Sequence, residues 1–98
     1  MPYVVQYDVP GDERVYAQVK TAIGNQDPAG LRVHLVVRSP TGGLRHIEVW
    51  DNALDQERFE RERVAPAVAE VLRSMGVDPV PSLPPRDPLD LVDLHVVR

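Results

Sequence analysis

The sequence predicts an α+β fold in one domain, residues 1–98. Three observations predict it. Runs of β-branched and aromatic residues are typical of strands, apolar residues recur between them at helical spacing, and turn residues stand at each junction. A chain of 98 residues has room for a single core. The expected order of elements is strand, helix, strand, strand, helix, strand.

The first strand is expected at residues 3–9, YVVQYDV, where β-branched and aromatic residues dominate. The next four residues, PGDE, provide a turn and the acidic residues that favour the start of a helix. Gly24 and Asn25 end this helix. Its apolar face comprises Val15, Val19, Ala22 and Ile23.

Residues 31–38 and 44–50 are the strands of a predicted hairpin. A three-residue loop of Pro40, Thr41 and Gly42, with Gly42 in the left-handed region, would join them. Directly opposed residues of a hairpin lie on the same side of the sheet. The odd loop length therefore sorts the hairpin cleanly into two faces, whereas a two-residue loop would mix them.

One predicted face is aliphatic, and it is expected to lie under the helices, whose apolar stripes need a partner. It holds Leu31, Val33, Leu35, Val37, Ile47 and Val49. The other face is polar and aromatic, with Arg32 opposite Trp50, His34 opposite Glu48, and Val36 opposite His46.

The second helix is expected to begin at a cap provided by Asp51 or Asn52. Pro66 falls within its apolar pattern, and an interior proline costs about 3 kcal/mol. The sequence therefore predicts two helical pieces with Pro66 in the first turn of the second. Gly76 ends the helix.

Residues 77–89 are rich in proline, which predicts a stiff, ordered arm. Residues 90–98 then close the chain as the fourth strand. The resulting order is that of the ferredoxin-like, split βαβ arrangement with an antiparallel sheet.

Composition excludes several classes of function. The net charge of −4 and the scattered arginines argue against nucleic-acid binding, which needs a basic stripe for phosphates. The absence of cysteine excludes disulfides, thiolate nucleophiles and iron–sulfur clusters. No apolar run is long enough for a membrane span and no signal peptide is visible, so we expect no membrane partner and a cytoplasmic location.

The polar face of the hairpin predicts a homodimer. Trp50 and Val36 are poor choices for a face in solvent, and a small domain gains core by association. Two such sheets packed face to face would enclose this face in a barrel-like cavity shared by two subunits.

With this order of elements, the sequence resembles the antibiotic biosynthesis monooxygenase-like (ABM) group of the dimeric α+β barrel superfamily. The resemblance covers residues 3–76 and 90–98. It rests on the segments PAGLRVHLVV and IEVWDNALDQERF. They contain a Pro-Ala-Gly turn at 28–30, Glu48-Val49-Trp50 at the end of a strand, and an acidic start to the following helix. The proline-rich arm departs from the family pattern; it is expected to cover a pocket mouth or to embrace a partner subunit.

The resemblance implies a homodimer with a pocket between sheet and helices. It also implies activities that range from cofactor-free oxygenation of aromatic polyketides to haem degradation. Trp50 and Gln6 match pocket positions of some members, so Gln6 is expected to face inward. The haem-degrading branch needs a histidine on the second helix, and residues 52–76 contain none. The expected function is thus a small-molecule pocket protein without a cofactor, a monooxygenase acting on an aromatic or enolisable substrate. The alternative is a non-catalytic dimer that binds a ligand or a protein.

Within this hypothesis, His34 and His46 are candidate bases and Glu48 orients the imidazole. The alternative is a polar set hydrogen-bonded across strands, since perturbed ion pairs are often structural. A metal site of His34, His46 and His95 is not established by strand spacing alone, and none is predicted. The candidate ligand-binding residues are Trp50, Tyr7, Gln6 and Arg32.

Overall fold

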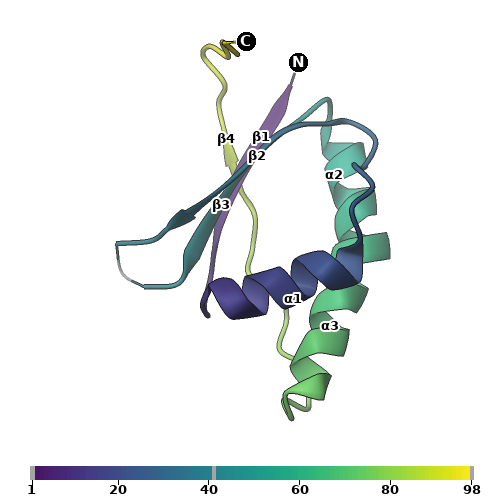
Figure 1. Ribbon diagram of the computed structural model, residues 1–98. Coiled ribbons are helices and arrows are strands. Elements are labelled where there is room, and N and C mark those ends of the chain that lie inside the picture. Colours follow the sequence, from purple (N-terminus) through teal and green to yellow (C-terminus); the bar gives the residue numbers. More distant parts are fainter. Residues whose placement is uncertain (1, 41, 98) are drawn as a thin grey trace.

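The computed structural model describes residues 2–40 and 42–97, which contain a four-stranded antiparallel sheet with its helices on one side (Figure 1). The strand order is β2-β3-β1-β4. The predicted α+β class with an antiparallel sheet is confirmed. The elements are β1 (Tyr3–Val9), α1 (Glu13–Ile23), β2 (Leu31–Arg38), β3 (Leu44–Trp50), α2 (Ala53–Phe59), the π-helical turn η1 (Glu60–Val64), α3 (Ala65–Ser74) and β4 (Asp87–Leu89).

Helix α1 begins and ends where the turn residues predict. The Asp12 side chain accepts hydrogen bonds from the backbone amides of Arg14 and Val15, which have no partner within the helix. Gly24 follows the last turn with a φ of 94°, a value that glycine adopts without strain.

The second helical segment was predicted as two pieces, and it is one continuous helix whose winding changes ahead of Pro66. Asn52 is the cap, and its side-chain oxygen accepts a hydrogen bond of 2.9 Å from the amide of Asp55. Pro66 lies in the first turn of α3, and η1 joins α2 to α3 without a break. A proline clashes with the carbonyl four residues before it, so the wider π-helical turn ahead of Pro66 lets the chain continue.

A glycine is required at position 30, within the Pro-Ala-Gly turn. Gly30 has a φ of 87°, and its carbonyl accepts a hydrogen bond from the Asp51 amide. A Cβ at this position would collide with the Asp55 side chain in the first turn of α2. The close approach fixes the loop before β2 against the start of the second helical segment.

The register of the β2–β3 hairpin is confirmed over most of its length. As predicted, Arg38 pairs with Leu44. The predicted partners of His34 and Val36 on β3 are confirmed as well. Gly42 has a φ of 94°, while Thr41 lies outside the described residues. The pairing of Arg32 with Trp50 was wrong, because a bulge between Leu31 and Val33 places Leu31 opposite Trp50. The extra residue in one strand takes Arg32 out of the alternation.

The assignment of the two sheet faces was also wrong: the helices cover the polar and aromatic face. Tyr16 of α1 lies edge-on to His46 at 5.5 Å between ring centroids, and Phe59 of α2 packs on Trp50 at 5.6 Å. Leu35 and Val37 on the aliphatic face are 51% and 44% exposed. Strand alternation separates the two faces, but it does not say which of them the helices cover. Burying the indole and phenyl rings removes a large apolar area from water, and this favours the observed side.

Strand β1 lies between β3 and β4, and its residues alternate between the same two faces of the sheet. Tyr3, Val5 and Tyr7 pair with residues of the helix-covered face, opposite Trp50, Glu48 and His46 respectively. Gln6 pairs with Ile47 and therefore lies on the uncovered aliphatic face, not on the inward face expected from the family resemblance.

The fourth strand is shorter and earlier than predicted. β4 comprises Asp87–Leu89 and pairs with Val4, Val5 and Gln6 of β1, whereas residues 90–97 have no regular secondary structure. β1 begins at Tyr3, and Pro2 before it has no amide hydrogen to donate. Within the described part of the chain, the alternating apolar pattern after Leu89 therefore pairs with no strand.

Candidate functional site

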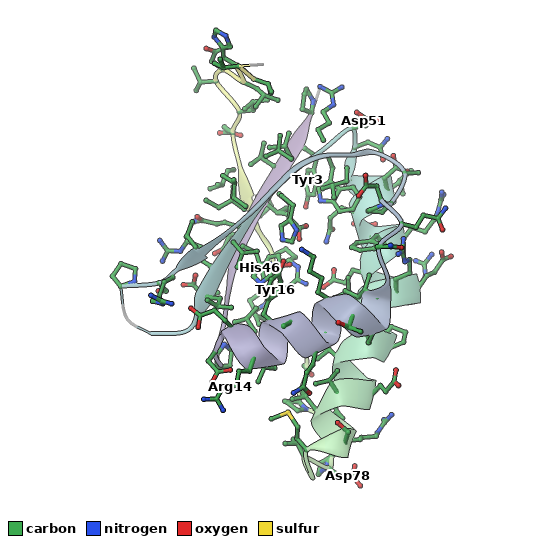
Figure 2. The ribbon with its side chains drawn as sticks, in the orientation of Figure 1. Tyr3, Arg14, Tyr16, His46, Asp51 and Asp78 are labelled. Atoms are coloured by element: carbon green, nitrogen blue, oxygen red, sulfur yellow. The ribbon has the colours of Figure 1, made fainter. Side chains whose placement is uncertain are left out.

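A polar cluster lies on the helix-covered face of the sheet, where a core would normally be apolar. It consists of His34 on β2 and of His46, Glu48 and Trp50 on β3, with Tyr7 on β1. We call His34, His46 and Glu48 the His–Glu cluster. Figure 2 shows His46 next to Tyr16 of α1, in the space between sheet and helix. The sequence predicted these residues on one face, and the structure brings them together within one protomer.

Glu48 is buried and held by two hydrogen bonds. The Tyr7 hydroxyl donates to Oε2 at 2.7 Å, and the Trp50 indole Nε1 donates to Oε1 at 2.9 Å. Trp50 is fully buried, with 0% of its surface exposed. Both carboxylate oxygens thus have a partner, which offsets the cost of burying a charge-bearing group. The arrangement fixes the orientation of the carboxylate toward His34.

The two histidines contact each other through ring nitrogens. His34 Nε2 lies 3.0 Å from His46 Nδ1 and 3.9 Å from Glu48 Oε2. His46 is buried and stacks on Tyr7, with centroids 4.6 Å apart and planes inclined by 9°. The His34 side chain is 32% exposed. His34 is therefore the member of the His–Glu cluster that solvent and solutes can reach.

Both imidazoles are driven toward the neutral form. Burial lowers the pKa of His46 to about 4, with the neighbouring His34 and Arg86 acting in the same direction. Burial also lowers the pKa of His34; the charge of Glu48 opposes this shift and that of Lys20 adds to it. At neutral pH the pair carries unprotonated ring nitrogens in a partly dry environment.

Arg86 at the end of the proline-rich arm closes the cluster from the other side. Its guanidinium carbon lies 3.4 Å from the centroid of the Tyr7 ring, its Nη2 pairs with Glu60 of η1 at 2.8 Å, and its Nη1 donates to the Pro84 carbonyl. Burial raises the pKa of the Tyr7 hydroxyl, the charge of Glu48 raises it further, and Arg86 partly opposes them. Tyr7 therefore stays a phenol and a hydrogen-bond donor.

Sequence reasoning missed Arg86 and its polar contacts with Glu60 and, through Glu60, with Gln56. Gln56 of α2 is buried and donates to Glu60 at 3.2 Å, so that arm, π-helical turn and helix are linked by polar contacts. The available signal was the one basic residue in a segment rich in proline and apolar residues. A long charged side chain is seldom buried unless it is paired, and here the pair forms with Glu60 rather than with the neighbouring Asp87.

Two predicted ligand-binding residues lie away from the cluster. Gln6 is on the opposite face of the sheet, and Arg32, at the bulge, forms an exposed ion pair of 2.5 Å with Asp51. His95 is exposed in the segment after β4, which extends past the sheet in Figure 1. The described residues that converge as possible metal ligands are therefore His34, His46 and Glu48, without His95.

A hollow of about 490 Å³ lies elsewhere, at the end of α1. It is lined by Arg63 and by the loop that connects α1 to β2, residues 23–29. Arg63 already donates hydrogen bonds to the carbonyls of Ile23 and Gln26. None of its lining residues belongs to the His–Glu cluster, so the hollow and the cluster are separate features.

Neither a protein-family model nor a curated protein matches this chain. The ABM resemblance therefore stays a prediction. Function has to be argued from the site itself, since one fold hosts many activities. Among the described residues, no helix combines the length and apolar character needed to cross a bilayer.

Proposed function

We propose that the protein is a homodimeric small-molecule pocket protein in which His34 removes a proton from an aromatic or enolisable substrate. The observation that carries the proposal is the position of His34. It is a part-exposed imidazole backed by a buried imidazole at 3.0 Å and by a carboxylate at 3.9 Å. A general base needs an open lone pair on one side and groups that stabilise the proton it accepts on the other.

The roles of the remaining residues follow from their contacts. Glu48 stabilises the imidazolium that forms on His34, and Tyr7 and Trp50 hold Glu48 in place. His46 fixes the His34 ring through the nitrogen–nitrogen contact. Because the cluster is largely shielded from water, the charge of Glu48 acts on His34 more strongly than it would in solvent.

Cofactor-independent oxygenation is the reaction that fits such a base. Removal of a proton from an activated CH₂ group leaves a carbanion, whose electrons reduce dioxygen as a carbon–oxygen bond forms. The proton returns to give a hydroperoxide. Loss of water then leaves a carbonyl, with one oxygen atom in the product and the other in water. The substrate supplies all the electrons, and the protein supplies the base and a shielded site.

Oxygen uptake with anthrone, an aromatic ketone with an acidic CH₂ group, tests the proposal. We expect protein-dependent formation of anthraquinone, and a rate at least about 100-fold lower in His34→Gln, the range typical of losing a general base. His95→Gln is the matched control, because His95 is an exposed histidine outside the cluster. Equal rates in the wild type and His34→Gln, after subtraction of spontaneous oxidation, would exclude His34 as the base.

A specific observation also favours the non-catalytic alternative. Both oxygens of Glu48 are occupied by hydrogen bonds from within the protomer, as in a self-contained structural network. In that case the wild type shows no oxygen uptake above background. If the protein binds the aromatic ketone without reaction, the Trp50 fluorescence changes. If its partner is another protein, the fluorescence stays the same.

The homodimer in this proposal uses the uncovered aliphatic face. Leu35 and Val37 are exposed at its β2 edge, whereas Val4 and Val49 nearer β1 are buried, and the segment after β4 exposes Val92 and Val96 in strand-like alternation. Exposed apolar surface of this extent is typical of an interface. The strand order and the helices on one side fit a ferredoxin-like protomer of a dimeric α+β barrel. The second copy would cover the aliphatic face and leave the His–Glu cluster inside each protomer.

Replacing Leu35 with glutamate is expected to convert a dimer into a monomer, because a charge would be buried in the contact between sheets. Sedimentation velocity on the wild type, Leu35→Glu and Leu54→Glu checks this. Leu54 is 70% exposed on helix α2 and serves as the matched control. A monomeric wild type, or the same mass for all three proteins, would contradict the dimer.

A further inference from the structure

We propose that the His–Glu cluster binds one divalent transition-metal ion, with Zn²⁺ as the best match. Its ligand atoms, a nitrogen from each histidine and a carboxylate oxygen, all lie within 4.8 Å of one another. Two of the three side chains, His46 and Glu48, are buried on adjacent positions of one strand face. The inference goes beyond the proposed function, since it needs no substrate.

The distances suit a metal after a small movement. Zinc–nitrogen bonds are about 2.0–2.1 Å, so two ligands of one ion can lie no more than about 4.2 Å apart. His34 Nε2 lies 3.0 Å from His46 Nδ1 and 3.9 Å from Glu48 Oε2, both within that span. The third pair, His46 and Glu48, lies within 4.8 Å, so these two side chains need to approach by at most about 0.6 Å.

Surrounding side chains hold two of the ligands in advance. Tyr7 and Trp50 each donate a hydrogen bond to Glu48, and each oxygen keeps a further lone pair for a metal. The His46 ring is stacked on Tyr7 and bordered by Tyr16. Outer contacts of this kind orient ligands and raise metal affinity. The cluster is therefore better prepared for an ion than three surface residues would be.

The donor set favours zinc, cobalt or nickel over magnesium and calcium. Two imidazole nitrogens suit first-row transition metals, whereas the hard cations prefer oxygen ligands. Three protein ligands leave a fourth position, which the exposed side of His34 leaves open to solvent. A bound ion takes His34 Nε2, the nitrogen that faces His46 and Glu48, and the neutral ring then carries its proton on Nδ1, the solvent-side nitrogen that serves as the base in the proposed function. Metal binding and proton removal at His34 therefore exclude each other.

Calorimetric titration of Zn²⁺ into chelator-treated, dialysed protein tests the site. We expect one Zn²⁺ per chain in the wild type and in His95→Gln, and affinity reduced at least about tenfold in His34→Gln, since losing a direct ligand should cost no less than losing an outer contact. His34 is the exposed ligand, so its variant is expected to fold, which circular dichroism verifies. Co²⁺ supplies a second readout through its visible absorption, expected in the wild type and lost in His34→Gln.

Three outcomes would overturn the site: no binding to the wild type, equal affinity in His34→Gln, or loss of binding in His95→Gln alone. The titration contains no substrate, so it separates this inference from the proposed oxygenase. Metal binding without oxygen uptake would support the metal site and exclude the oxygenase activity. Oxygen uptake without metal binding would do the reverse. If both occur, Zn²⁺ is expected to abolish the oxygen uptake.

Discussion

Replacing Trp50 with alanine is expected to lower the free energy of unfolding by about 3–5 kcal/mol, the usual cost of removing a large buried aromatic side chain. Trp50 is fully buried, packs on Phe59, and donates the hydrogen bond that satisfies Glu48 Oε1. The alanine variant leaves both a cavity and a buried acceptor without its partner. For a domain of this size the loss is a large share of the total stability.

Urea denaturation followed by circular dichroism measures this effect, because the variant lacks the only tryptophan and its fluorescence. Trp50→Phe is the matched variant. It keeps much of the ring and loses the indole donor, so we expect an intermediate loss. A Trp50→Ala protein as stable as the wild type would show that the ring is not part of the core.

The second large effect is acid destabilisation through His46. Its pKa is about 4 in the folded protein against an ordinary value of 6.5. Above pH 6.5 both states are neutral at this ring. Between pH 6.5 and 4 His46 is protonated in the unfolded chain but stays neutral in the folded protein, so the free energy of unfolding falls as the pH falls. Below about 4 both states are protonated and the loss is complete, at about 3 kcal/mol.

The groups around His46 set this shift. Arg86 and His34 add to the effect of burial, while Tyr7 and Tyr16 contribute the surrounding rings. Urea denaturation at pH 7.5 and pH 4, with a chelator present, should give a smaller pH effect in His46→Asn than in the wild type. His95→Asn, which changes an exposed histidine, should behave as the wild type. The same pH effect in His46→Asn would contradict the assignment.

The sequence predicted those parts of the fold that local chemistry decides. Asp12 and Asn52 cap helices, and Pro66 lies in the first turn of α3, because each acts on neighbouring backbone groups. Hairpin alternation brought His34, His46 and Glu48 to one face, since pairing follows loop length. These features depend on a few residues on either side, which the sequence displays directly.

The predictions that were wrong concern features that depend on contacts between residues far apart in the sequence. The alternation in β2 and β3 is the same whichever face the helices cover, and the choice lies in the fit of Tyr16 and Phe59 against the sheet. The last strand was misplaced because residues 90–97 have a strand pattern without a neighbouring strand. Arg86 was missed because its partners, Tyr7 and Glu60, are far from it in sequence.

The buried contact of Arg86 with Glu60 and Tyr7 has a consequence for how the molecule opens. Peeling the arm away from the sheet would expose an arginine and a glutamate that are 10% and 23% exposed when paired, and would uncover the Tyr7 ring. The arm, the π-helical turn and the edge of the sheet at β4 should therefore loosen together. In hydrogen exchange they would form one cooperative unit, although 22 residues of chain, 65–86, separate η1 from β4.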